Sequence, residues 1–195
     1  MKHIKSIYLD HSATTPVDKA VLKAMLPYFN RIYGNPSSLH SFGQTAAGAV
    51  SRAREQAAEF LNCDIGEIIF TSGATEADNL AIFGVIKALR KNNQGKKLHA
   101  ITSAIEHPAV LEPFRKLEAL GIEVTYLPVE KNGIVNLKIF KKAIKNNTVL
   151  VSLMYVNSEV GSIQPIREIG KIIENVNKAR VGQGHKIYFH TDAVQ

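Results

Sequence analysis

The sequence has a single cysteine, no apolar run long enough to cross a membrane, and neither an internal repeat nor a low-complexity segment. Because Cys63 has no second cysteine to pair with, a disulfide within the chain is excluded, as is usual in a reducing compartment. Residues 1–5 lead into a strand-like segment rather than into the apolar centre of a signal peptide. We therefore expect a cytoplasmic protein with an ordinary thiol.

Acidic residues are in the minority, with 17 Asp and Glu against 24 Lys and Arg, and the formal net charge is +7. A nucleic-acid groove would need basic and aromatic side chains to alternate along one surface. Neither basic cluster does so. The clusters are Lys138, Lys141, Lys142 and Lys145, on the outer face of a predicted helix, and Arg90, Lys91, Lys96 and Lys97, around a polar loop. We predict no nucleic-acid partner, and expect the charge to help attract small anions.

The 195 residues are 45% hydrophobic, enough for one domain with a core, or for a domain plus a small appendage. Short apolar runs alternate with segments in which apolar residues recur at helical spacing. After an extended piece at 7–10, strands are predicted at 67–70, 98–102, 123–127, 149–154 and 187–190. Helices are predicted at 14–29, 46–60, 74–89, 108–120, 137–145 and 166–176. This order is typical of an α/β fold with a mainly parallel sheet flanked by helices.

One segment, FTSGATEADN at residues 70–79, combines a strand end, a turn of small residues and a helix start. The first N–H groups of such a helix, near Ala74 and Thr75, lack internal acceptors and suit an anion. Gly73 lets the backbone approach a ligand closely, and Ser72 adds a hydroxyl. These residues indicate a phosphate cradle. A well-capped helix without a ligand explains them equally well.

Polar side chains follow four of the predicted strands, where ligands of parallel sheets usually bind. Beyond the cradle, the groups are Ser103, Glu106 and His107; Asn157, Ser158 and Glu159; and Thr191, Asp192 and Gln195. Each group alone is weak evidence, because loops after strands are commonly polar. Together they would place a phosphate site, an imidazole, a carboxylate and two amides around one pocket.

Several runs together resemble the cysteine desulfurase family, within the class V, fold-type I group of pyridoxal-phosphate-dependent aminotransferases. The runs are YLDHSATTPV (8–17), GNPSSLHSFG (34–43), FTSGATEADNLAI (70–82), EHPAVLE (106–112), NSEVGSIQPI (157–166) and FHTDAVQ (189–195). They occur in family order over nearly the whole chain. The resemblance implies a partial fold-type I large domain that binds pyridoxal phosphate, corresponding to the amino-terminal portion of the family.

The resemblance also implies roles for single residues. It places Asp192 at the pyridine nitrogen, which a carboxylate keeps protonated, and His107 over the ring, where it stacks and handles protons. Gln195 corresponds to the amide at the phenolic oxygen, and Ala74 and Thr75 correspond to the phosphate contacts. Apart from the family, Asp192 could be a surface acid and His107 a structural residue before a proline.

Three further residues lie in a loop that resembles the active-site or dimer-facing loop of the family: Asn35, Ser38 and His40. A plain polar turn explains them equally well. Asn157 corresponds to a cofactor contact, and Ser158 stands where the family usually has asparagine. Serine can still donate one hydrogen bond, but with a shorter reach.

The 195 residues do not contain the family's Schiff-base lysine or its persulfide-forming cysteine in matching context. Lys171, Lys178 and Lys186 lie in other surroundings, and Cys63 is not in a catalytic loop. We expect residues 1–15 to form an amino-terminal arm on the small-domain side and residues 16–195 an incomplete cofactor-binding large domain. The isolated chain is expected to be inactive.

The implied function of the full-length family is removal of sulfur from L-cysteine, giving alanine and an enzyme persulfide. The sulfur passes to an acceptor protein for iron–sulfur cluster or thio-cofactor supply, and the full-length enzyme is a homodimer without a metal. Two alternatives stay open. One is another class V enzyme, such as a selenocysteine lyase or an aminotransferase. The other is a non-catalytic scaffold with a degenerate cofactor fold.

Overall fold

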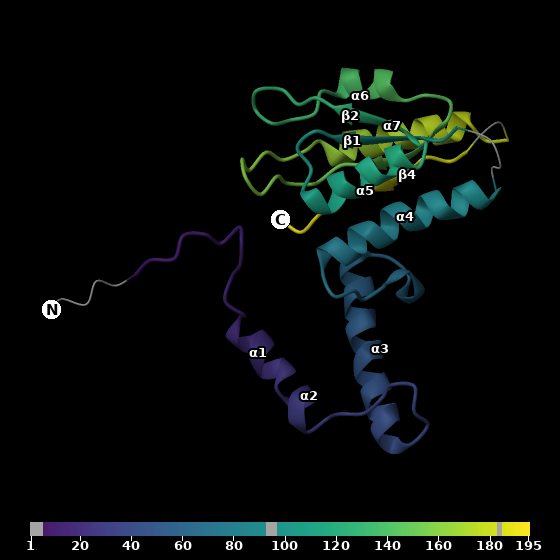
Figure 1. Cartoon of the computed structure of the whole chain (residues 1–195). Helices are drawn as coiled ribbons and strands as arrows, with labels where there is room; N and C mark the ends of the chain where they lie inside the picture. The colour runs from purple at the N-terminus through teal and green to yellow at the C-terminus, as the bar shows by residue number, and fades with distance from the viewer. Residues whose placement is uncertain (1–5, 93–96, 183–184) are drawn as a thin grey trace. The chain divides into compact units, whose positions relative to one another are not determined.

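The computed structural model describes residues 6–92, 97–182 and 185–195 (Figure 1). The chain divides into two compact units, Met1–Phe70 and Thr71–Gln195, and each is described by itself. Within the described residues, no helix has both the length and the apolar character needed to cross a bilayer.

The first unit is helical. It contains α1 (Lys19–Met25), α2 (Pro27–Asn30), α3 (Ser41–Leu61) and a 3-10 turn, η1 (Ile65–Glu67). The first helix was predicted to begin between residues 14 and 16, and this is wrong. It begins after Asp18, whose Oδ1 accepts hydrogen bonds from the N–H groups of Ala20 (2.7 Å) and Val21 (3.4 Å). The predicted helix is also split before Pro27, which has no N–H to continue the ladder.

The strand predicted at residues 67–70 is also wrong for this structure. Glu67 belongs to η1, and its carboxylate accepts a hydrogen bond from the N–H of Asp64 (2.9 Å). The carbonyl of Ile68 accepts a hydrogen bond from Arg54, whose guanidinium lies 4.9 Å from the centre of the Phe70 ring. These local contacts occupy groups that a strand would offer to a neighbour, and an apolar run cannot by itself supply that neighbour.

The second unit confirms the predicted parallel sheet. Its strands are β1 (His99–Ser103), β2 (Glu123–Leu127), β3 (Thr148–Ser152) and β4 (Tyr188–His190). They pair in parallel in the order β2-β1-β3-β4. α4 (Ala74–Asn92) precedes the first strand, and α5 (Pro108–Ala119), α6 (Leu137–Ala143) and α7 (Ile166–Ala179) lie between the strands in the chain, all within a few residues of the predicted ranges.

Two apolar clusters fill the space on the two faces of this sheet. On one face, Ile82 of α4 and Phe114 of α5 pack against Ala100 of β1. On the other face, Phe140 of α6 and Ile169 of α7 pack against Ile101 of β1. Because successive residues of a strand point to opposite faces, this alternation buries both sides of the sheet.

The carboxyl ends of the parallel strands lie at one edge, and backbone hydrogen bonds continue beyond them. The N–H of Leu153 donates to the carbonyl of His190 (3.1 Å), and the N–H of Tyr155 donates to the carbonyl of Asp192 (2.8 Å). The segments after β3 and β4 are thereby held beside one another. This edge carries the polar groups that the sequence singled out.

Candidate functional site

The start of α4 has both the cap and the open N–H groups that the sequence predicted. Glu76 Oε2 accepts hydrogen bonds from the N–H and the hydroxyl of Ser72, both at 2.7 Å. Ser72 therefore stabilises the turn. Its hydroxyl, and to a smaller extent its N–H, lower the pKa of Glu76 by donating hydrogen bonds to the carboxylate. In the first turn of α4, the N–H of Ala77 donates a hydrogen bond to the carbonyl of Gly73 (3.1 Å). The N–H groups of Ala74 and Thr75 precede it and have no acceptor within the helix.

The space beside this turn is open. A Cβ built on Gly73 would meet no atom within 4 Å. Thr75 is exposed and adds a hydroxyl beside the N–H groups. Partial positive charge at a helix start, room for a ligand and a hydroxyl donor together fit a phosphate group.

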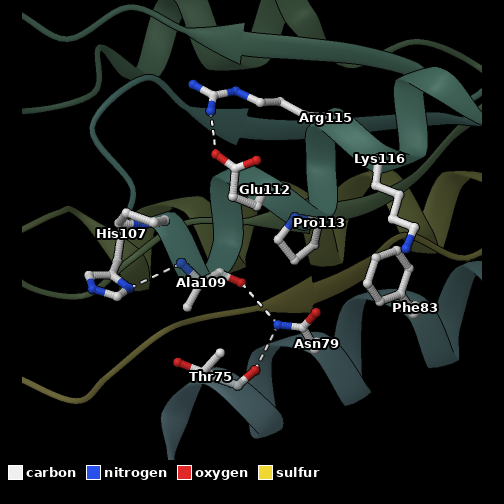
Figure 2. A pocket seen from close by; sticks show the side chains of 10 residues that line it. Thr75, Asn79, Phe83, His107, Ala109, Glu112, Pro113, Arg115 and Lys116 are labelled. Carbon is white, nitrogen blue, oxygen red and sulfur yellow. Dashed lines mark hydrogen bonds and ion pairs between the residues drawn. The ribbon is translucent and has the colours of Figure 1, made fainter.

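His107 caps the start of α5. Its Nδ1 accepts a hydrogen bond from the N–H of Ala109 (3.1 Å), so in the neutral ring the proton is on Nε2. The imidazole is exposed, and Figure 2 shows its ring beside the start of the helix, joined by a dashed line to the backbone nitrogen of Ala109. This cap agrees with the structural role that the sequence analysis considered for His107, as a residue before a proline. It uses Nδ1 and leaves Nε2 available to a ligand.

Thr75 and His107 line one pocket of about 640 Å³ between α4 and α5 (Figure 2). Asn79 connects the two helices, because its Nδ2 donates to the carbonyls of Thr75 (2.7 Å) and Ala109 (3.4 Å). Figure 2 places Phe83 and Lys116 at the opposite end of the pocket. The structure thus brings together the predicted phosphate contact and the predicted ring contact.

Glu106 is buried, with 4% of its surface exposed, and connects two strand ends. Its carboxylate accepts hydrogen bonds from the hydroxyl of Ser103 (2.5 Å) and from the N–H of Met154 (2.9 Å to Oε2). Burial raises the pKa of Glu106 to about 7, while these two hydrogen bonds act in the opposite direction. The carboxyl group is therefore near its midpoint of ionisation at neutral pH.

Asn157 reinforces the same connection. Its Nδ2 donates to the carbonyl of Ile105 (2.9 Å), and its Oδ1 accepts from the N–H groups of Glu159 (2.9 Å) and Val160 (3.0 Å). The side chain is thus engaged within the protein. Ser158 lies next to it in the chain and is partly exposed.

Asp192 follows β4, and its Oδ1 accepts a hydrogen bond from the N–H of Val194 (3.2 Å). Its charge raises the pKa of both Asp78 and Glu106, in each case as a smaller cause than burial. His107 acts on Asp78 in the opposite direction. Asp192 and His107 are therefore both within electrostatic range of Asp78. Gln195 is exposed at the end of this segment.

Asp78 is a site residue that the sequence analysis missed. It lies in α4, with 3% of its surface exposed, and burial raises its pKa to about 6. Asp78 precedes the buried Ile82 by one helical turn, and this spacing was the available signal. A carboxylate is almost never fully buried on the apolar face of a helix unless it is paired.

The other candidate residues make local contacts of their own. Lys171, Lys178 and Lys186 are exposed, and Lys178 pairs with Glu174 at 2.5 Å. In the first unit, the side chain of Asn35 accepts a hydrogen bond from the N–H of Ser37 (2.9 Å), and His40 caps α3. These are the contacts of a polar turn. Among the described residues, no three His, Cys, Asp or Glu side chains converge as metal ligands would.

Comparison with known proteins agrees with the geometry. The sequence matches the family described as aminotransferase class-V over residues 7–195. It is 49% identical over 191 residues to the cysteine desulfurase IscS of Methanosarcina thermophila, covering 98% of this chain and 44% of that protein. It is 49% identical over 193 residues to the cysteine desulfurase of Homo sapiens, covering 98% of this chain and 39% of that protein.

Solved structures give the same result. A NifS-like protein superposes with a TM-score of 0.88 at 39% identity, covering 97% of this chain and 49% of that chain. A structure described as SspA in complex with cysteine superposes with a TM-score of 0.86 at 39% identity, covering 97% and 51%. The chain spans about half the length of these proteins, and it matches their amino-terminal portion. The parallel sheet, the helices on its faces and the sequence match over residues 7–195 together show that the chain belongs to the class-V aminotransferase family.

Proposed function

We propose that this chain contributes the cofactor cradle of a cysteine desulfurase, an enzyme that removes sulfur from L-cysteine to give alanine and a protein-bound persulfide. The observation that carries the proposal is that Thr75 and His107 line one pocket. Asp192 and His107 are also both within electrostatic range of Asp78. The relatives named as cysteine desulfurases support the choice of reaction.

The residues present fit pyridoxal phosphate. The open N–H groups of Ala74 and Thr75 suit its phosphate, and the free space at Gly73 leaves room for it. A buried, unpaired carboxylate oxygen of Asp78 and the neighbouring Asp192 suit a positively charged ring nitrogen. When bound, the cofactor supplies an electron sink for the bonds of the substrate amino acid.

We assign each residue of the chain a task toward that group. Ala74 and Thr75 hold the phosphate, and Asp192 keeps a proton on the ring nitrogen. His107 lies over the ring, and its Nε2 is the atom that takes up or returns a proton. Gln195 binds the phenolic oxygen. Asn157, with Ser158 beside it, shapes the wall of the site, because its amide already bonds the segment after β1.

We also propose that the linking lysine and the sulfur-carrying cysteine are not among residues 1–195, so that this chain by itself does not turn over cysteine. In the same proposal, residues 1–15 are an arm and residues 16–195 are the large domain. The full-length protein would be a cytoplasmic homodimer that passes sulfur to an acceptor protein for iron–sulfur cluster or thio-cofactor supply.

The test compares the 195-residue chain with the open reading frame that contains it. Both are incubated with pyridoxal phosphate and L-cysteine, and alanine and sulfide are measured in the presence of a thiol reductant. We expect alanine from the longer product only. Alanine from the 195-residue chain would overturn the assignment of the missing groups, and a longer product that transaminates without releasing sulfide would favour another class V activity.

A further inference from the structure

A layer of polar side chains crosses the sheet beneath α4. Thr102 of β1 pairs in register with Ser152 of β3, and Ser152 pairs with His190 of β4. Thr102 and Ser152 have none of their surface exposed. Two residues earlier, the same face of these strands carries Ala100 and Leu150, which belong to the apolar core. The polar layer is thus confined to the carboxyl ends of the strands.

Asp78 reaches this layer from α4. Its Oδ1 lies 3.4 Å from Nε2 of His190, whose Nδ1 is 2.8 Å from the hydroxyl of Ser152. The second oxygen, Oδ2, is buried and has no hydrogen-bond donor among the residues that the structure describes. A buried carboxylate with one unsatisfied oxygen is costly, so the carboxyl group must carry a proton or face a cation.

His190 does not readily provide that cation. Burial lowers the pKa of His190, and the charge of Asp192 only partly opposes this effect. The other ionisable groups that act on Asp78 are Asp192, which raises its pKa, and His107, which lowers it. Glu106 shares the cluster, since Asp78 and Asp192 both raise the pKa of Glu106. Within the described part of the chain, Asp78, Glu106 and Asp192 therefore act on one another as three carboxyl groups without a fixed cation.

We propose that Asp78 is a positioning residue that stores a proton within electrostatic range of Asp192 and releases it when a cationic aromatic ring binds at Asp192. The O–H bond of the Asp78 carboxyl group breaks, the proton leaves to solvent, and the carboxylate adds a second negative charge to that of Asp192. Ser152 and His190 hold the Asp78 carboxyl group in place from the sheet. This inference rests on the proposed function, because the ring is that of the phosphorylated pyridine.

A purely structural role for Asp78 predicts something different. If the carboxyl group only bonds His190 to α4, Asp78→Asn would affect the fold and would weaken every ligand of the site equally. If the Asp78 carboxyl group responds to the charge of the ring, the weakening of binding by Asp78→Asn depends on whether the ligand has a cationic ring. Two phosphate esters separate these cases: pyridoxine 5′-phosphate has a basic ring nitrogen, whereas benzyl phosphate has an aromatic ring without one. Neither has an aldehyde that could react with lysines.

The experiment is calorimetric titration of both esters into the wild-type chain, Asp78→Asn and the control Glu174→Gln, which removes an exposed carboxylate on α7. Each titration is run near pH 6 in two buffers of different ionisation enthalpy, which gives the number of protons released. Circular dichroism checks that each variant is folded. For pyridoxine 5′-phosphate we expect Asp78→Asn to bind about tenfold more weakly than wild type and to release about half a proton less.

For benzyl phosphate we expect the three chains to agree within about twofold. Equal weakening of both esters by Asp78→Asn, or an unchanged proton count, would overturn the role of Asp78 while leaving the cradle intact. If wild type bound neither ester, the proposed function would fail as well. A variant that does not fold would itself indicate the structural role and count against the proposal.

Discussion

Glu106 Oε2 accepts a hydrogen bond from the backbone N–H of Met154 at 2.9 Å, and this contact ties the segment after β1 to the segment after β3. His107 is the next residue, so the same contact fixes the start of α5. A buried carboxyl group thus determines where the exposed imidazole lies. The site is built on strand ends that are connected through side chains as well as through the sheet.

The first prediction concerns Glu106 and pH. Burial raises the pKa of Glu106 to about 7 from an unfolded value near 4.5, so the folded state holds the proton more strongly. The resulting stability is present below pH 4.5 and is lost as pH rises through 7. Relative to Glu106→Gln, which keeps the shape and an acceptor for Met154, wild type should lose about 3 kcal/mol of unfolding free energy between pH 4.5 and 8. Urea unfolding of both proteins across this range measures the difference, and parallel curves would contradict it.

The second prediction has the opposite sign. His99 is fully buried, and its ring nitrogens lie 2.7 Å from the Thr148 hydroxyl and 2.8 Å from the Thr125 hydroxyl. Burial, followed by the charge of Lys145, lowers the pKa of His99 to about 4. The neutral ring therefore stabilises the fold above pH 6.5, and this stability is lost as pH falls toward 4.

Compared with His99→Gln, wild type should accordingly lose about 2 kcal/mol of unfolding free energy between pH 7 and pH 4.5. Thermal or urea unfolding at the two pH values measures this change. A difference between the two proteins that does not vary with pH would show that His99 is not held neutral.

The third prediction separates Asn157 from Ser158. Asn157→Ala removes the bond to the Ile105 carbonyl and the acceptor of two N–H groups, all in a buried setting. We expect a loss of about 2–3 kcal/mol in unfolding free energy. The matched control Ser158→Ala should change it by less than about 0.5 kcal/mol. Comparable losses from both variants would mean that the buried amide does not secure this loop.

The fourth prediction tests the cradle. Ala74 is the first residue of α4, where proline is tolerated, so Ala74→Pro removes one N–H donor without breaking the helix. The affinity for benzyl phosphate should fall about tenfold, because hydrogen bonds to charged groups are strong. Thr75→Ser keeps both the N–H and a hydroxyl and should bind within about threefold of wild type. If Ala74→Pro bound normally, the phosphate would have to lie elsewhere.

Much of the second unit could be predicted from the sequence, because its signals are local. The apolar run that becomes β2 and the spacing of Phe140 against four lysines specify a strand and a helix without reference to the rest of the chain. The alternation of strands and helices then predicts parallel pairing, which puts the residues after β1 and β4, among them His107 and Asp192, at the same edge of the sheet.

What could not be predicted depends on partners. Residues 67–70 have the composition of a strand, but Arg54 donates a hydrogen bond to the Ile68 carbonyl, and Glu67 belongs to η1. The spacing of Asp78 from Ile82 indicates the buried face of α4, but only the folded structure shows that Asp78 contacts His190 there. The hydrogen bond from the Asn157 side chain to the Ile105 carbonyl could not be predicted either, because no pattern in the sequence connects these two residues.

The central claim is that the start of α4 and the loops after β1 and β4 together hold a phosphorylated pyridine with an acid at its nitrogen. The most direct measurement is the nitrogen NMR shift of pyridoxine 5′-phosphate labelled with ¹⁵N in the ring and bound to this chain, at a pH above that at which the free ligand loses its ring proton. The account predicts a protonated nitrogen in wild type and a deprotonated one in Asp192→Ala. A bound ring that is deprotonated in both proteins would contradict it.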